Sequence, residues 1–144
     1  MVEQDVERTL GYLVKRVQQS LRRRCDAALR PTGLSMAQYA VLRALADHPR
    51  ASAADLARRC FITRQSLQDL LVALRSAGLV TDSDGSPRGR ARALALTAAG
   101  AERLTRAHDA VMTVEADMAE GISVSAYREA AAALTRCAEN LEVR

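Results

Sequence analysis

Hydrophobic residues recur every three to four positions along much of the chain, which is the spacing of amphipathic helices. The first such stretch runs from Asp5 to about Leu29, with charged residues between the apolar ones. A helix of this length extends roughly 37 Å and carries more apolar surface than so small a protein can cover. The pattern therefore predicts one long helix that packs against a partner chain.

Three shorter helices are predicted next, each opened by a hydroxyl side chain that caps the free N–H groups of the first turn. Gln38 and Asp55 follow the first two caps by three residues, the spacing of a capping box, and Gly78 ends the third helix. The expected caps and helices are Ser35 with a helix to Asp47, Ser52 with a helix through Cys60, and Thr63 with a helix from Arg64 to about Ala77.

The next segment has the pattern of a β-hairpin. Leu79 and Val80 form one short apolar run and Ala91 to Leu96 another, and the residues between them are rich in Asp, Gly, Ser and Pro. Thr97 then caps a second long helix, whose expected apolar side holds Ala101, Leu104, His108, Val111, Met112 and Met118. A break from Gly121 to Ser125 precedes a last helix with an apolar stripe of Ala130, Ala131, Leu134, Cys137, Ala138 and Leu141.

Composition agrees with a mainly helical protein. Of 144 residues 49% are hydrophobic, with one Phe, three Tyr and no Trp, which favours close-packed helices over an aromatic-rich sheet. The net charge of +4 comes almost wholly from arginine, since Lys15 is the only lysine. Arginine binds phosphate or guanine bidentately, but a biased coding composition explains the same arginine content, so charge alone does not decide the function.

Cysteine usage and the lack of a targeting segment predict a reduced, cytoplasmic protein. Cys25, Cys60 and Cys137 lie far apart and show no metal-ligand spacing. No stretch approaches 18 uninterrupted apolar residues, so we expect no membrane association. The sequence also lacks a Ser/His/Asp set, a phosphate-cradling glycine loop and paired carboxylates in a recognisable site, so we expect neither an enzyme nor a cofactor or metal site.

The helix that starts at Arg64 has two different faces. Leu67, Leu70, Leu71 and Leu74 form an apolar stripe, and the remaining face begins with groups that bind nucleic acid: a glutamine reads adenine, an arginine binds guanine or phosphate, and hydroxyls bind phosphate. We predict DNA contacts for Thr63, Arg64, Gln65, Ser66 and Gln68. Any solvated helix shows a similar face, and Asp69 would repel phosphate while accepting from a cytosine amino group.

The hairpin carries alternating arginines. Arg88, Arg90 and Arg92 face one side of an extended strand, where a narrow and electronegative minor groove would offset their mutual repulsion. The alternative is a charged loop tip in solvent. Because the hairpin follows the predicted recognition helix directly, we favour DNA contact by Arg88 and Arg90.

The stretch from Gly33 to Gly100 resembles the MarR (multiple antibiotic resistance regulator) family. It contains GL-[ST]-x-x-Q at Gly33 to Gln38 and the LA pair at Leu56 and Ala57. It also contains L-x-x-x-GLV from Leu74 to Val80 and L-T-x-x-G from Leu96 to Gly100. The resemblance implies a single domain over residues 1–144, with a winged helix-turn-helix at 34–97 and dimerisation helices at 5–30 and 98–142.

The resemblance further implies a ligand-responsive repressor that binds double-stranded DNA at a palindromic operator as a homodimer. The wing motif D-x-R falls on Arg88, Gly89 and Arg90, so Arg90 would contact the minor groove and an arginine replaces the acid that braces it, unless Asp82 or Asp84 takes that role. This departure and the outer-face Asp69 and Val72 motivate an alternative, a winged-helix protein-interaction module or anti-regulator that has lost DNA readout.

The family often has a ligand pocket between its dimerisation helices and the winged domain. By resemblance this pocket would hold a small aromatic or phenolic acid among Tyr12, Arg16, Met36, Tyr39 and His108. The same residues are also ordinary core or interface positions, which is the alternative. Some relatives sense oxidants through a cysteine, and Cys25, which follows three arginines, is the best redox candidate in this chain.

Overall fold

The computed structural model describes residues 5–82 and 94–143. The chain divides into two compact units, Met1–Val114 and Glu115–Arg144. The first unit holds η1 (Val6–Arg8), α1 (Leu10–Leu29), η2 (Arg30–Thr32), α2 (Met36–Asp47), α3 (Ala53–Arg59), α4 (Arg64–Ser76), β1 (Val80–Asp82) and β2 (Leu94–Leu96). Helix α5 (Ala98–Met118) runs from the first unit into the second, which contains α6 (Val124–Glu142).

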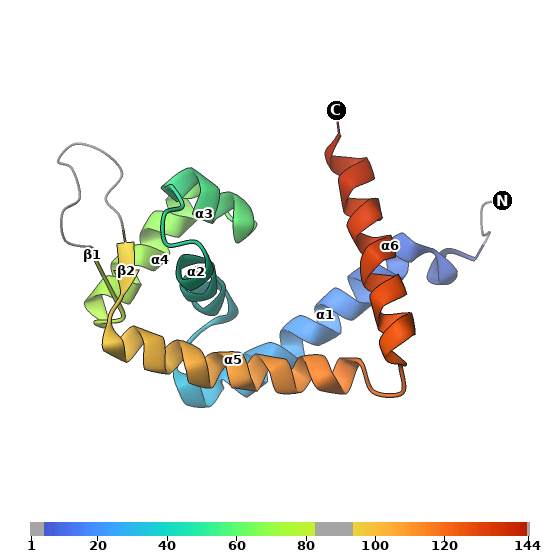
Figure 1. Cartoon of the computed structure of the whole chain (residues 1–144), viewed down its shortest axis with the longest axis horizontal. Helices are drawn as coiled ribbons and strands as arrows, with labels where there is room; N and C mark the ends of the chain where they lie inside the picture. The colour runs from blue at the N-terminus through green and yellow to red at the C-terminus, as the bar shows by residue number, and fades with distance from the viewer. Residues whose placement is uncertain (1–4, 83–93, 144) are drawn as a thin grey trace. The chain divides into compact units, whose positions relative to one another are not determined.

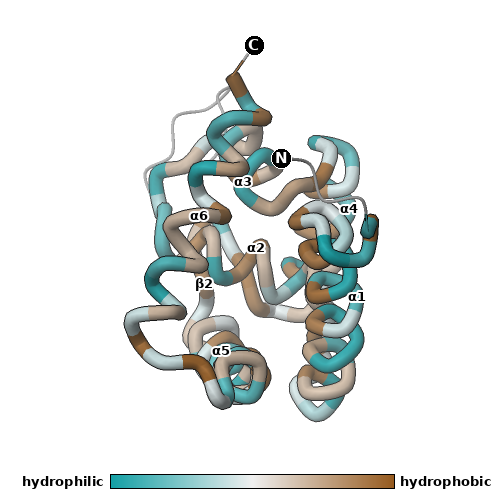
Figure 2. The backbone as a smooth tube through the Cα atoms, turned by 90° about the vertical axis from the view of Figure 1, so that its right-hand side faces the viewer, coloured by the Kyte–Doolittle hydropathy of each residue, from teal (hydrophilic) through white to brown (hydrophobic). Residues whose placement is uncertain are grey.

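Helix α1 begins later than the sequence pattern predicts. Thr9 has an extended backbone, and its hydroxyl accepts a hydrogen bond from the Tyr12 N–H, so Thr9 caps α1 and the residues before it form a separate 3₁₀ turn. Only Cys25 and Leu29 of α1 are buried. Leu10, Val14 and Val17 are 59%, 47% and 47% exposed, and Figure 2 shows hydrophobic and hydrophilic residues alternating along this helix. The predicted excess of apolar surface on α1 is therefore present.

Helices α2, α3 and α4 start at the predicted caps. Ser35 and Gln38 form the reciprocal capping box of α2, and the Ser52 and Thr63 hydroxyls accept from the third N–H of α3 and α4. Helix α2 contacts α1, α3, α4 and β2 (Figure 1), and its Val41 and Leu42 are fully buried. The core of the first unit forms around α2, with leucines from α1, α3, α4 and the start of the hairpin.

The two strands pair antiparallel, with Val80 opposite Leu96. Thr97 joins this hairpin to α5: its N–H donates to the Leu79 carbonyl at 3.0 Å, its hydroxyl donates to the Gly78 carbonyl at 2.6 Å, and that hydroxyl also accepts from the Gly100 N–H. A Cβ atom on Gly100 would overlap the Leu79 carbonyl. A side chain at position 100 would therefore force the backbones of the hairpin and α5 apart.

The apolar sides of the last two helices differ from the prediction. Helix α5 buries Leu104, Ala107, Val111 and Val114. Met112 lies off this face and is exposed, and Met118 is in register with the face but is 38% exposed at the last residue of the helix. Helix α6 is capped by Ser123 and buries no residue within the chain; Leu134 and Leu141 are 48% and 82% exposed. This leaves the predicted α6 stripe open to another surface.

The described part of the chain is mainly helical with one small antiparallel strand pair. Three helices, α2 to α4, are followed by the pair β1 and β2, and helices α1, α5 and α6 flank them in sequence. Three helices followed by a two-stranded wing define a winged helix-turn-helix, the predicted fold class.

Candidate nucleic-acid interface

Helix α4 has one face in the core and one in solvent. Leu67, Leu71 and Leu74 are buried to within 2% exposure and Leu70 is half-buried, so the predicted stripe anchors the helix. The side chains of Arg64, Gln65, Ser66 and Gln68, in the first two turns, are exposed. The fold therefore presents the predicted contact residues together at the start of one rigid helix.

The first turn of α4 is suited to an anion. Thr63 Oγ1 accepts from the Ser66 N–H at 3.0 Å and donates to Ser66 Oγ at 3.0 Å. One of the free N–H groups is thus satisfied, while the others and the positive end of the helix dipole face solvent. A DNA phosphate supplies the acceptors that these groups lack.

Gln65 and Asp69 form an internal pair on this exposed face. Gln65 Nε2 donates to Asp69 Oδ1 at 3.1 Å. The bond holds the Gln65 side-chain amide against the next turn of the same helix. Asp69 thus has a structural partner on α4 and does not stand as an isolated negative charge.

The base of the wing is tied to α4. Arg75 Nη2 donates to Asp82 Oδ1 at 3.1 Å, which links the last turn of α4 to the end of β1. Asp82, which the sequence offers as a candidate brace of the wing, is thus paired with an arginine of α4. Arg88, Arg90 and Asp84 lie outside the described residues, so the predicted wing contacts stay predictions.

The turn between α3 and α4 contains a residue that the sequence analysis missed. Phe61 has φ 57° and is, among the described residues, the one non-glycine residue with positive φ. Its side chain is 93% exposed. The signal was present in the sequence, because the only Phe of the chain stands at the end of a helix where glycine is usual.

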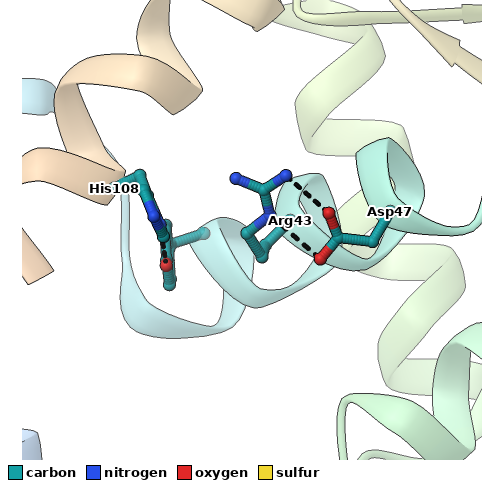
Figure 3. A network of polar contacts seen from close by, with 4 residues as sticks. Arg43, Asp47 and His108 are labelled. Atoms are coloured by element: carbon teal, nitrogen blue, oxygen red, sulfur yellow. Dashed lines mark hydrogen bonds and ion pairs between the residues drawn. The ribbon is translucent and has the colours of Figure 1, made fainter. Parts of the chain in front are cut away.

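The predicted ligand residues are only partly brought together. Tyr39 Oη lies 2.9 Å from His108 Nδ1, and the two rings stack with centroids 6.3 Å apart. On α2, the helix that carries Tyr39, Arg43 donates two hydrogen bonds to Asp47. Figure 3 shows this pair beside His108. The hydrogen bond from Arg43 lowers the pKa of Asp47.

The other three predicted ligand residues lie elsewhere. Met36 is half-buried and lines a separate hollow between α1, α2 and the α3–α4 turn. Tyr12 and Arg16 are exposed on α1, and within the described chain neither forms a hydrogen bond or ion pair with Tyr39, Met36 or His108. The single chain thus assembles two small groups rather than one five-residue pocket.

The redox prediction for Cys25 needs correction. Cys25 is 1% exposed in the core, because it lies on the buried side of α1 while the arginines before it point to solvent. A buried thiol is out of reach of an oxidant. Cys60, the C-cap of α3, is half-buried and packs against the core, and burial raises the pKa of its thiol.

Metal-binding clusters and membrane-spanning helices are both missing from the part of the chain that the structure describes. No group of three or more His, Cys, Asp or Glu side chains there is placed to hold a metal ion. In the same residues, no helix has the length and apolar character needed to cross a membrane.

The fold and the exposed recognition-type helix define a winged helix-turn-helix regulator, and comparison with known proteins gives the family. The MarR family profile matches residues 32–91. HTH-type transcriptional repressor Mb2911 of Mycobacterium bovis is 35% identical over 120 residues, which span 83% of this chain and 86% of the relative. The chain therefore belongs to the MarR family of transcriptional regulators.

Solved structures agree with this assignment. The MarR family protein Rv2887 of Mycobacterium tuberculosis, crystallised with salicylic acid, superposes with a TM-score of 0.71 and 34% identity, covering 92% of this chain and 96% of Rv2887. Rv2887 in complex with DNA gives a TM-score of 0.70 and 32% identity, covering 94% and 98% of the two chains.

Proposed function

We propose that this protein is a transcriptional repressor that binds double-stranded DNA through α4. The observation that carries the proposal is the capped first turn of α4, which presents Arg64, Gln65, Ser66 and Gln68 from a helix anchored by buried leucines. The printed name of the M. bovis relative and the DNA complex of Rv2887 support it. In this proposal α4 enters the major groove and Arg90 enters the adjoining minor groove.

The binding unit is proposed to be a homodimer on an inverted repeat. Helices α1 and α6 expose apolar residues that a single chain leaves uncovered, including Val14, Val17 and Leu134. A two-fold dimer would bring two copies of α4 to major grooves roughly one helical turn apart, about 10 bp. Sedimentation equilibrium tests the assembly, and a monomer at micromolar concentration would contradict it.

The effector is proposed to be a small aromatic or phenolic acid. Support comes from the structure of Rv2887 with salicylic acid and from the aromatic and cationic groups of the first unit. No cofactor is required in this proposal. Binding of an acid that weakens DNA affinity would make the repressor ligand-responsive.

Fluorescence anisotropy on DNA from upstream of the protein's own gene tests DNA binding. We expect affinity to fall steeply with salt and to exceed that for a scrambled sequence. Arg90→Ala should weaken binding to all sequences, whereas Gln68→Ala should narrow the difference between operator and scrambled DNA by about 1–3 kcal/mol. Arg23→Gln, which changes an exposed arginine on α1, is the control.

A second function has one observation in its favour. Val72 is 60% exposed on the outer face of α4, next to the face that carries Asp69. An apolar side chain beside an acid suits a protein partner better than a phosphate backbone. A stable dimer with equal, weak affinity for operator and scrambled DNA would favour this protein-interaction module over the repressor.

A further inference from the structure

Phe61 is an exposed aromatic residue in a backbone conformation that favours glycine. It stands at the left-handed position after α3, with φ 57°, where a side chain meets steric strain and glycine does not. The residue is 93% exposed, so its ring buries almost no surface within the chain in return. Strain that is kept without a packing gain is typical of functional positions. A contact made outside the chain explains this residue better than the fold does.

The turn between α3 and α4 places this ring next to the helix that is proposed to enter the major groove. Phe61 precedes Thr63, the N-cap of α4, by two residues, a span of at most about 7 Å. Ile62 between them packs against the core and anchors the turn. Along DNA, about 7 Å corresponds to two base-pair steps. When the first turn of α4 enters a groove about 12 Å wide, the Phe61 ring is therefore within reach of base edges in the same groove.

The charges around the ring are compatible with a polyanion. Phe61 lines a hollow together with residues of α1 and α2, and Arg22 is the one charged residue among the described residues of that lining. The positive end of the α4 dipole begins at Thr63, two residues further along the chain. A ring with a cation beside it, and with no carboxylate in the lining that it shares, can approach DNA without charge repulsion.

We propose that Phe61 reads a thymine of the operator by packing its ring against the thymine methyl group in the major groove. The inference rests on the proposed function, which it deepens by naming a base that the protein selects and a residue outside α4 that selects it. A phenylalanine side chain has no hydrogen-bonding group, and the apolar feature of base edges in the major groove is the thymine methyl. This contact adds to the hydrogen bonds proposed for the first turn of α4.

A double-mutant cycle between protein and DNA tests the contact. The probe is the upstream DNA of the anisotropy assay, with thymines replaced one at a time by deoxyuridine, which lacks only the methyl group. For the unaltered protein we expect one thymine in each half-site whose replacement weakens binding about fourfold, which corresponds to about 0.8 kcal/mol for one buried methyl group. In Phe61→Gly the same replacement should change affinity by less than about 1.5-fold, because the partner of the methyl group is gone.

Variants of residue 61 separate the ring from the backbone. Phe61→Gly and Phe61→Asn both accept the left-handed conformation and lack the ring. Both should weaken operator binding about tenfold, the loss of one base contact, and leave binding to scrambled DNA within about twofold. Phe61→Tyr keeps the ring and should bind the operator within about twofold of the unaltered protein. Val72→Ala, which shortens another exposed apolar side chain, is the matched control and should leave the deoxyuridine effect unchanged.

Stability and assembly measurements exclude indirect causes. Phe61→Gly relieves the left-handed strain, so its Tm should rise while its operator affinity falls. Unfolding cannot produce these two opposite changes together. Sedimentation equilibrium should show the same assembly for Phe61→Gly and the unaltered protein. A variant that dissociates the dimer would place the ring in the subunit interface and overturn the inference.

The inference and the proposed function fail in different ways. If the unaltered protein prefers the operator but no thymine is coupled to residue 61, the inference is wrong and the repressor stands. The same holds if the methyl effect disappears in Val72→Ala instead, or if Phe61→Asn loses affinity equally for operator and scrambled DNA. Equal losses would place the ring against the sugar-phosphate backbone, which carries no sequence information. Absence of operator preference in the unaltered protein refutes the repressor itself, before any variant is made.

Discussion

Helices α3 and α4 end in the same hydrogen-bonding motif, but the left-handed residue is Phe61 in one and Gly78 in the other. After α3, the N–H groups of Phe61 and Ile62 donate to Arg58 and Ala57; after α4, those of Gly78 and Leu79 donate to Arg75 and Leu74. Both are Schellman motifs. The values of φ are 57° and 74°, so the backbone requirement is shared and only the residue differs.

The surroundings of the two motifs differ as much as the residues. The Gly78 motif is held from outside by Thr97, which bonds the carbonyls of Gly78 and Leu79. The Phe61 motif faces the hollow. The end of α4 is therefore tied to the base of the wing, whereas the Phe61 ring at the end of α3 is 93% exposed.

The largest expected effect comes from disrupting the contact between Gly100 and the Leu79 carbonyl, next to the end of α4. Gly100→Ala places a Cβ against the Leu79 carbonyl, and the backbone must shift because that atom cannot rotate away. We expect a loss of about 3 kcal/mol in the free energy of unfolding, from urea titration at fixed protein concentration. Ala101→Gly, an exposed position on the same helix, is the control and should cost about 1 kcal/mol.

Changing the left-handed residue itself has a smaller effect. No atom lies near the Cβ position of Gly78, so Gly78→Ala introduces backbone strain and no clash. We expect a loss of about 1–2 kcal/mol by the same urea titration. An unchanged free energy of unfolding would mean that the backbone at residue 78 leaves the left-handed region without cost. That result would contradict the backbone requirement that the two motifs share.

The reverse change at the other motif should stabilise the protein. Phe61→Gly removes the strain at φ 57° and loses little buried surface, since the ring is 93% exposed. We expect a gain of about 0.5–1 kcal/mol in the free energy of unfolding by the same urea titration. A destabilised Phe61→Gly would show that the ring stabilises the fold despite its exposure.

The smallest expected effect is at the ion pair between Arg75 and Asp82, which links the last turn of α4 to β1. Arg75 and Asp82 are each more than a third exposed, so Asp82→Asn should cost less than about 1 kcal/mol. Asp55→Asn, which breaks the pair with Arg58 within α3, is the matched change at the other end. An Asp82→Asn loss well above that of Asp55→Asn would indicate that the pair organises the wing as well as the end of α4.

Local sequence signals predicted the helices of the winged domain because each is fixed by neighbours in the chain. A hydroxyl side chain caps an N–H three residues away, so Ser35, Ser52 and Thr63 identify the starts of α2, α3 and α4 without knowledge of the fold. The leucine stripe of α4 follows from helical periodicity in the same way. The exposed polar residues of α4 were found because they are the complement of that stripe.

Where sequence prediction failed, the deciding contacts are distant in the chain. Cys25 looked reactive beside three arginines, but its exposure depends on what packs over α1. Tyr39 and His108 are 69 residues apart, and nothing local shows that they form a hydrogen bond. The five residues predicted to line one ligand pocket lie in separate places in the single chain, because their positions also depend on contacts distant in the sequence.

The sequence by itself determined the order of helices, their caps, the hairpin and the family, because these depend on spacing within a few residues or on motifs read along the chain. Only the tertiary structure showed that the Gly100 and Leu79 backbones touch, and that Phe61 holds a strained conformation at the edge of a hollow. Packing sets which backbone can approach another and which ring stays in solvent, and this information lies in no single segment.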